Sequence, residues 1–269
     1  MERKINRIKL FPNDNNKSLL VTKELESELK KYNFQIVEDN YDLAISIGGD
    51  GSFLRMIKNC NFNENIYYIG VNSGTLGFLQ EIDIKDTKDF VKKLNDNNFK
   101  NERINIEETT IFTDKERYHF NSLNEIVVRS NNFDTLKIPV YIDDELLENY
   151  TGDGLLISTS TGSTAYNMSF GGSILYNTLD TLSITPIAPL RSKVYNTLVN
   201  PIVIPSTKVV TLIPNKNQNN LFIMIDGVNK KIDNVSKIEI KIDNKSIKIL
   251  RMNNFHFIKV INSKILDNK

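Results

Sequence analysis

The chain has 269 residues, 40% hydrophobic and 25% charged, so it is long enough to bury the cores of two domains. Its 34 lysines and arginines nearly balance 33 aspartates and glutamates, and a formal net charge of +1 gives no general field for nucleic acid or an anionic membrane. A single cysteine excludes an intramolecular disulfide, and because neither a membrane-length apolar run nor the apolar core of a signal peptide is present, we expect a cytoplasmic protein.

The residues up to about 100 alternate short apolar runs with helical patterns. Val21, Leu25, Leu29 and Tyr32 recur at spacings of four and three, which predicts an amphipathic helix. A later helix is expected at Phe90, Val91 and Leu94. Short strands are predicted at 8–11, 34–37, 43–47 and 66–71. Strands that alternate with helices indicate a parallel sheet covered by helices, and ligands of such sheets lie beyond the carboxyl ends of the strands.

A glycine-rich turn, Gly48-Gly49-Asp50-Gly51, follows the strand at 43–47 and precedes an apolar helical segment at 52–57. Backbone N–H groups at such a turn, beside the positive end of a helix dipole, suit a phosphate. A carboxylate in the same place costs electrostatic energy unless a metal or a proton transfer offsets it, so Asp50 is a candidate for chemistry. An ordinary tight loop is the alternative, since glycine and aspartate are common turn formers. The spacing matches neither the Walker motif nor the dinucleotide-binding glycine motif.

From about residue 102 the pattern changes to short β runs, which predict a sandwich or two packed sheets. The runs lie at 126–128, 138–142, 155–157, 209–213, 221–225 and 237–242. We expect Asp243-Asn244-Lys245-Ser246 to turn the chain into a further strand at 247–250. The tail at 255–261 has no obvious strand partner nearby and could return to the first domain.

A second glycine block, Gly152-Asp153-Gly154, leads through a short strand into the small and hydroxylated residues Ser158–Ala165 and then Tyr166. This composition suits close approach of the backbone to a polyhydroxylated ligand, although ordinary loops rich in serine and threonine look similar. Tyr166 could stack on a base. Asn124-Glu125 comes directly before the predicted strand at 126–128 and is a candidate for ligand binding. The alternative interpretation is a loop with a solvated acid.

Other chemistry has little support in the sequence. The two histidines, His119 and His256, are too isolated for a metal site. No serine has a histidine and aspartate in a pattern typical of a hydrolase triad.

The motif blocks occur in a fixed order: GGDG, NSGTLGFL, NE, GDGLLISTSTGSTAYNMSFGG and IDG. In this order they resemble the bacterial NAD kinases, from about Asp42 through Gly227, and 251–255 is similar to the closing segment of that family. The GGDG element is shared with diacylglycerol-type lipid kinases and 6-phosphofructokinases. The NE pair and the TGSTAY block are far more specific.

The resemblance implies an α/β domain with a parallel sheet at 1–101, joined by the terminal segment 251–269, and a β-rich, sandwich-like domain at 102–250. It implies NAD in the cleft and a homodimer or homotetramer. The implied reaction transfers the γ-phosphoryl of ATP, as its complex with Mg²⁺ or another divalent metal, to the adenosine ribose 2′-hydroxyl of NAD, which gives NADP.

The same resemblance assigns roles to individual residues. Asp50 matches the proposed proton acceptor, while Gly51 and Arg55 fall at the substrate loop. Matches to dinucleotide-binding or flanking pocket positions are Phe78, Asn124, Glu125, Thr151, Asp153, Thr164, Ala165, Tyr166, Asn167, Met168, Ser169 and Ala188. No residue is assigned to a metal. A secondary hydroxyl needs a positioned base, and the rest of phosphoryl transfer is orientation and charge neutralisation.

Some residues depart from the family pattern. Ser52 replaces a usual threonine and keeps the hydroxyl, whereas Thr75 and Thr151 stand where many relatives have basic residues. A lipid or sugar kinase sharing GGDG is an alternative, as is a dinucleotide-binding protein without turnover. The sequence leaves open whether polyphosphate replaces ATP and whether NADH is accepted.

Overall fold

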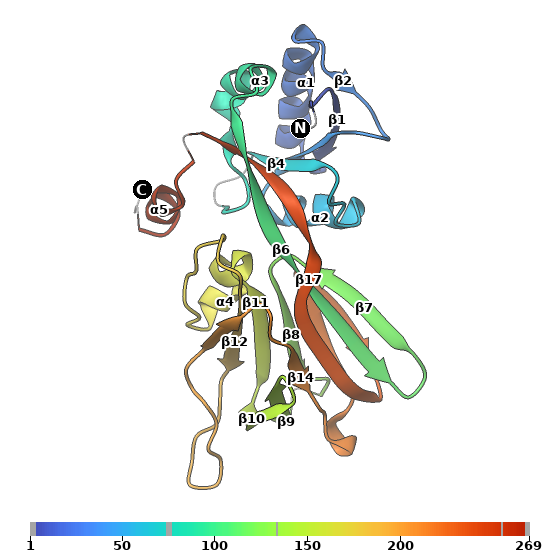
Figure 1. The fold of residues 1–269 in the computed structure, drawn as a ribbon, viewed down its shortest axis with the longest axis vertical. Helices are drawn as coiled ribbons and strands as arrows, with labels where there is room; N and C mark the ends of the chain where they lie inside the picture. The colour runs from blue at the N-terminus through green and yellow to red at the C-terminus, as the bar shows by residue number, and fades with distance from the viewer. Residues whose placement is uncertain (1–3, 74–76, 133, 254, 267–269) are drawn as a thin grey trace. The chain divides into compact units, whose positions relative to one another are not determined.

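The computed structural model describes residues 4–73, 77–132, 134–253 and 255–266 (Figure 1). Contacts within the chain divide it into two units. The first comprises Met1–Ile104 with Ser246–Lys269, and the second comprises Asn105–Lys245. The domain limits expected from the sequence, 1–101 with 251–269 and 102–250, remain our proposal for the folding domains.

The first unit contains a parallel sheet in the order β2-β1-β3-β4. Its strands are β1 (Arg7–Pro12), β2 (Gln35–Ile36), β3 (Leu43–Gly48) and β4 (Tyr67–Asn72), and β5 (Ile82–Asp83) pairs with β4. All six residues of β3 are buried, as expected of a central strand with both faces covered. The parallel sheet predicted from the sequence is therefore confirmed.

Helices cover both faces of this sheet. They are α1 (Asn16–Lys31), α2 (Asp50–Asn59) and α3 (Thr87–Asn95), the last preceded by η1 (Ile84–Asp86). Figure 1 shows α1 and α3 together above β4 and α2 below it. The predicted stripe Val21, Leu25 and Leu29 of α1 is buried in one cluster with Phe90 of α3. An Asn15 side chain that accepts a hydrogen bond from the Ser18 N–H begins α1.

The second unit is built mainly from strands. One antiparallel sheet has the order β13-β12-β11-β8-β15-β16, and β10, β9, β14 and the first part of β17 follow one another in a second. Their bounds are β8 (Glu125–Ser130), β9 (Leu136–Ile142), β10 (Glu145–Gly152), β11 (Gly154–Thr159), β12 (Thr181–Ile187), β13 (Ile202–Pro205), β14 (Val210–Leu212), β15 (Leu221–Ile225), β16 (Val228–Ile232) and β17 (Val235–Met252). The short helical segments η2 (Thr161–Thr164), α4 (Tyr166–Ser169) and η3 (Lys216–Gln218) interrupt the strands.

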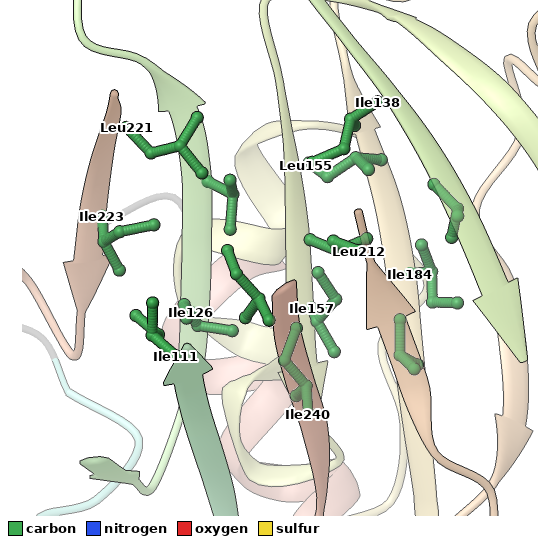
Figure 2. Close-up of a cluster of buried hydrophobic side chains, with 14 of the residues drawn as sticks. Ile111, Ile126, Ile138, Leu155, Ile157, Ile184, Leu212, Leu221, Ile223 and Ile240 are labelled. Carbon is green, nitrogen blue, oxygen red and sulfur yellow. The ribbon is translucent and has the colours of Figure 1, made fainter. Parts of the chain in front are cut away.

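Residues from both sheets of this unit form one apolar core. Figure 2 shows Ile126 and Ile157 of β8 and β11 lying with Leu212 and Ile240 of β14 and β17. Alternate residues of each strand contribute to this core, which is typical of two packed sheets. The predicted sandwich-like, β-rich domain is confirmed.

The turn expected at Asp243–Ser246 is wrong, because β17 runs without a break from Val235 to Met252. None of these four residues has the positive φ that a tight hairpin turn needs. Asp143 and Asp144, between β9 and β10, do turn the chain at φ values of 49° and 68°. Pairing of β17 with β14 before this segment and with β4 after it keeps the backbone extended.

Two long strands carry the chain from one unit into the other. They are β17 and β6 (Phe99–Thr113), and β6 also pairs with β7 (Arg117–Ser122). After β17 the tail belongs to the first unit and forms α5 (Phe257–Ile261) and a π-helical turn, Asn262–Leu266. Within the described residues, no helix is both long and apolar enough to span a membrane.

Candidate functional site

Asp50 is the first residue of α2, directly beyond the carboxyl end of β3. Its carboxylate accepts hydrogen bonds from the backbone N–H groups of Phe78, at 2.7 Å, and Leu79, at 3.0 Å. A Cβ at Gly77 would lie 2.5 Å from Oδ1 of Asp50, so this glycine allows the close approach of the two segments. The predicted strand, glycine turn and helix are all present.

Opposing effects act on the Asp50 carboxyl. Burial raises its pKa, while backbone N–H groups of Phe78, Leu79 and Gln80 and the positive charge of Lys264 lower it. Burial dominates, and the pKa is raised above the ordinary value. A partly dehydrated carboxylate in a fixed orientation is suited to accept a proton.

The other predicted residues of the first unit surround this turn. Gly51 is exposed, with no atom near the place of a Cβ. Arg55 is exposed on α2, and its guanidinium donates to the Asn13 side chain at 3.2 Å. Phe78 is half-buried. Thr75 lies outside the described residues.

A cavity of about 480 Å³ in the first unit reaches Phe78. The ends of β4 and β17, the segment 78–83, α3 and the C-terminal segment line it, and Lys259 and Lys264 are among its charged residues. Sequence reasoning missed Lys264, because a lone lysine in a polar tail carries no motif that would distinguish it.

In the second unit, Asn124 and Glu125 are both buried at the entrance of β8. The Asp226 carboxylate accepts hydrogen bonds from the backbone N–H groups of Leu123 and Asn124, both at 2.8 Å, and of Glu125 at 3.3 Å. Asp226 and Gly227 form the tight turn between β15 and β16, with φ values of 45° and 77°. The IDG block therefore holds the backbone of the NE pair, a role that its sequence spacing did not reveal.

The NE pair also presents unsatisfied polar atoms. Oδ1 of Asn124 and Oε2 of Glu125 are buried and have no hydrogen-bond partner within the described part of the chain. With 3% of its surface exposed, Glu125 is not the solvated acid of the alternative interpretation. Burial, and then the charge of Asp226, raise its pKa to about 8. Buried polar atoms without partners are uncommon, and a ligand is one way to satisfy them.

The serine- and threonine-rich block packs directly on the NE pair. Oγ1 of Thr159 donates to the carbonyl of Leu123 at 2.6 Å, and the Thr159 N–H donates to the carbonyl of Asn124 at 2.9 Å. A Cβ at Gly162 would lie 2.1 Å from the carbonyl oxygen of Asn124. The structure thus joins two motifs that lie far apart in the sequence.

The close approach of the backbone to a polyhydroxylated ligand stays a prediction for the six residues 158–163. All six are buried, and the hydroxyls of Ser160 and Ser163 bond to the carbonyls of Leu179 and Leu175. A buried hydroxyl needs an internal partner, so these side chains hold the turn together.

The following residues are more accessible. Thr164 and Ala165 are half-buried, while Tyr166, Met168 and Ser169 are exposed. Tyr166 lies edge-on to Phe170, with 4.8 Å between ring centroids. Asn167 differs, because its buried side chain accepts a hydrogen bond from Thr185 and donates to the carbonyl of Ser163 at 3.4 Å. A direct ligand contact by Asn167 remains a prediction.

Thr151, Asp153 and Ala188 lie around the second glycine turn. Thr151 is buried, and its N–H donates to the Thr197 hydroxyl at 3.2 Å. Asp153 is exposed between β10 and β11, and its N–H donates to the carbonyl of Ile187 at 3.0 Å. Ala188 follows β12 with a φ of 44°, in the left-handed region.

Side chains that can bind a metal do not cluster in the described residues. No group of three or more histidine, cysteine, aspartate or glutamate side chains among them could hold a metal ion.

Two family models match the chain. The ATP-NAD kinase N-terminal domain matches residues 3–99, and the ATP-NAD kinase C-terminal domain matches residues 123–251. An NAD kinase from Finegoldia magna is 40% identical over 240 residues, 86% of this chain and 87% of the relative. An NAD kinase from Clostridium beijerinckii is 32% identical over 240 residues, 87% of this chain and 83% of the relative.

Two solved structures share the fold. A yeast NADH kinase complexed with NADH has a TM-score of 0.87 at 19% identity, over 100% of this chain and 90% of that one. An NAD kinase from Archaeoglobus fulgidus in complex with ATP has a TM-score of 0.77 at 22% identity, over 96% of this chain and 97% of that one. Since both family models match and close relatives extend over most of the sequence, the chain belongs to the ATP-NAD kinase family.

Proposed function

We propose that this NAD kinase transfers the γ-phosphoryl of ATP to the 2′-hydroxyl of the adenosine ribose of NAD, with Asp50 as the general base. The observation that carries the assignment of the NAD contacts is the pair of unsatisfied buried oxygens on Asn124 and Glu125. An NAD kinase must recognise a ligand rich in N–H and O–H donors, and among the described residues these two oxygens have no hydrogen-bond partner.

In the second unit we assign the dinucleotide contacts to side chains around the NE pair. Oδ1 of Asn124 and the carboxylate of Glu125 accept hydrogen bonds from amide or hydroxyl groups of NAD. Asp153 is exposed and offers a further carboxylate, and exposed Tyr166 stacks on or flanks the adenine. Removing Glu125 or Asp153 should then raise the Michaelis constant for NAD more than that for ATP.

In the first unit Asp50 accepts the proton from the 2′-hydroxyl as that oxygen attacks the γ-phosphorus. An ionised carboxylate offers about four lone-pair directions, and the backbone N–H groups of Phe78 and Leu79 use one on each oxygen. A direction therefore remains for the substrate hydroxyl. The rest of the transfer depends on orientation and on neutralising phosphate charge.

A divalent cation belongs with the phosphoryl donor in this scheme. Because Mg²⁺ usually keeps several waters and binds through substrate phosphates with one or two carboxylates, we propose that Mg²⁺ or another divalent metal enters bound to the phosphates of ATP. The choice between ATP and polyphosphate as donor is a direct experimental question, answered by comparing both in the assay below.

The assay supplies purified protein with NAD and either MgATP or polyphosphate, and measures NADP. Replacing Asp50 with asparagine should lower kcat by about 10²–10⁴, the range typical of general base catalysis. Asp42→Asn is the matched control, since the buried Asp42 carboxylate also accepts two backbone N–H groups, from Asn6 at 3.1 Å and Arg7 at 2.9 Å. The control should lose stability and keep its kcat.

Asparagine at position 50 also places an amide donor against a backbone N–H group. We therefore expect Asp50→Asn to lose about 1–3 kcal/mol of unfolding free energy, and kcat has to be measured well below the melting temperature of each variant. Near-normal turnover would refute Asp50 as the base. Labelled phosphate in a lipid or a fructose phosphate, without NADP, would instead indicate a lipid or sugar kinase. Tight NAD binding without NADP would indicate a non-catalytic protein.

We further propose a cytoplasmic homodimer or homotetramer. Exposed apolar side chains on the second unit support an association surface, including Val194, which is 82% exposed, and Val203 on the edge strand β13. Light scattering of the purified protein distinguishes the two assemblies from a monomer.

A further inference from the structure

Gln80 connects the segment after β4 to the glycine turn that carries Asp50. Only 6% of Gln80 is exposed, and its Nε2 donates to the carbonyl of Gly49 at 2.7 Å and to Oγ of Ser46 at 3.4 Å. Both acceptors lie at the end of β3 or just beyond it. The side chain of Gln80 thus links the segment that follows β4 to the turn that follows β3.

The room for this side chain comes from Gly70 in β4. A Cβ at Gly70 would lie 1.9 Å from Oε1 of Gln80 and 2.6 Å from its Cδ, so any larger residue would displace the amide. Gly49 does not depend on Gln80 for a partner, because its carbonyl also accepts the N–H groups of Ser52 and Phe53 in α2. The bond from Gln80 therefore adds a connection and does not merely satisfy an orphaned group.

The residues 78–80 contact the Asp50 turn at several points. Backbone N–H groups of Phe78 and Leu79 bind the carboxylate, and that of Gln80 also lowers the carboxyl pKa. The Gln80 side chain then binds the preceding residue, Gly49. These hydrogen bonds connect the carboxylate, its backbone donors and Gly49.

We propose that Gln80 is a positioning residue for Asp50, whose side-chain amide fixes the 78–80 segment against the glycine turn and so sets the direction of the carboxylate. The inference rests on the proposed function, in which Asp50 accepts the proton. It assigns to Gln80 no contact with substrate.

Loss of the Gln80 amide has two expected consequences. The carboxylate becomes free to reorient, and a small misplacement of a catalytic group can cost about 10- to 100-fold in rate. The reoriented carboxylate of Asp50 also accepts hydrogen bonds from fewer N–H donors. Its charged form is then less stabilised, and the pKa of Asp50 rises. Lys264 is the charged group that faces Asp50 from the C-terminal segment, and it remains in place. The acid limb of the kcat profile should therefore move to higher pH.

Gln80→Met tests the proposal, because methionine keeps an unbranched chain of similar length without the amide. We expect kcat to fall about 10- to 100-fold, with the KM for NAD changed less than threefold and the acid limb moved to higher pH. Gly70→Ala should reproduce both effects although it removes no hydrogen-bonding group. Tyr68→Phe is the control, since it removes another hydrogen bond from a buried side chain of this unit to a backbone carbonyl, Tyr68 to Asn63 at 3.0 Å.

A wild-type kcat and pH profile in Gln80→Met, with only a lower melting temperature as in Tyr68→Phe, would overturn the proposal. If Gly70→Ala does not fold, the result for Gln80→Met still decides. Failure of the proposed function has a different signature, because then Asp50→Asn would itself keep near-normal turnover. An inactive Asp50→Asn beside a fully active Gln80→Met would reject the positioning role alone.

Discussion

Replacing Glu125 with glutamine should make the free protein more stable at high pH while weakening its binding of NAD. The carboxyl group of Glu125 has a pKa of about 8 in the folded protein, against 4.5 ordinarily, because it is buried beside Asp226. The buried carboxyl of Glu107 interacts with both of these acids. Glutamine imitates the protonated form and carries no charge that needs solvation.

The sign of the effect follows from proton binding. Between pH 4.5 and about 8 the folded state holds a proton that the unfolded state has released, so the unfolding free energy falls as the pH rises. The slope is about 1.4 kcal/mol per pH unit, and the full shift corresponds to ~5 kcal/mol. Glutamine cannot ionise, so Glu125→Gln does not undergo this fall in unfolding free energy. Compared with the wild type, it should therefore be nearly equal in stability at pH 4.5 and more stable at pH 9, by up to ~5 kcal/mol.

Binding should change in the opposite direction. A hydrogen bond to a charged acceptor contributes about 1.5–3 kcal/mol, so the loss of the carboxylate should weaken NAD binding about 10- to 100-fold at pH 9. At pH 6, where wild-type Glu125 is protonated before NAD binds, the two proteins should differ less.

Urea unfolding of both proteins at pH 4.5 and pH 9 measures the stability change, and calorimetry with NAD measures binding. Glu24→Gln, on the exposed face of α1, is the control and should show the same stability difference from wild type at both pH values. If the difference between Glu125→Gln and wild type is also independent of pH, Glu125 is charged in the free protein and the burial argument is refuted.

Two further predictions concern the same unit. Tyr166→Ala should weaken NAD binding about tenfold or more, because stacking of a base on an aromatic ring contributes about 1–3 kcal/mol. Calorimetry with NAD measures this change. Tyr118→Ala is the control, because Tyr118, like Tyr166, pairs with a neighbouring aromatic ring. Asp226→Asn should lower the unfolding free energy by about 1–3 kcal/mol and raise the KM for NAD. The reason is that the Asp226 carboxylate accepts hydrogen bonds from three backbone N–H groups around the NE pair. An unchanged KM would contradict that role.

Local patterns in the sequence were sufficient for the elements that carry the site. The buried strand before Gly48 and the apolar helix after Asp50 have distinct periodicities, and both form as predicted. The entrance of β8 at Glu125 is also where the apolar run indicated. These features depend on residues that lie close together in the sequence. Apolar periodicity is informative over that range.

Side-chain partners were not predictable in the same way. Asp226 binds backbone groups 101 to 103 residues away, and Gln80 reaches Gly49 across Gly70. Nothing local in the sequence separates these residues from ordinary polar ones. At Asp243–Ser246 the local residue types indicated a turn, and that prediction was wrong. The backbone stays extended there because β17 pairs with β14 before this segment and with β4 after it.

A base for a ribose hydroxyl has to be ionised near neutral pH and still accept a proton during attack. Burial alone would favour the protonated form of Asp50, and backbone donors alone would make the carboxylate a weak base; the chain combines the two, with the donors of residues 78–80 held by Gln80. If base and support act as one unit, their effects on kcat cannot add. The double variant Asp50→Asn with Gln80→Met should be no slower than Asp50→Asn alone, whereas independent roles would slow it by the further factor measured for Gln80→Met.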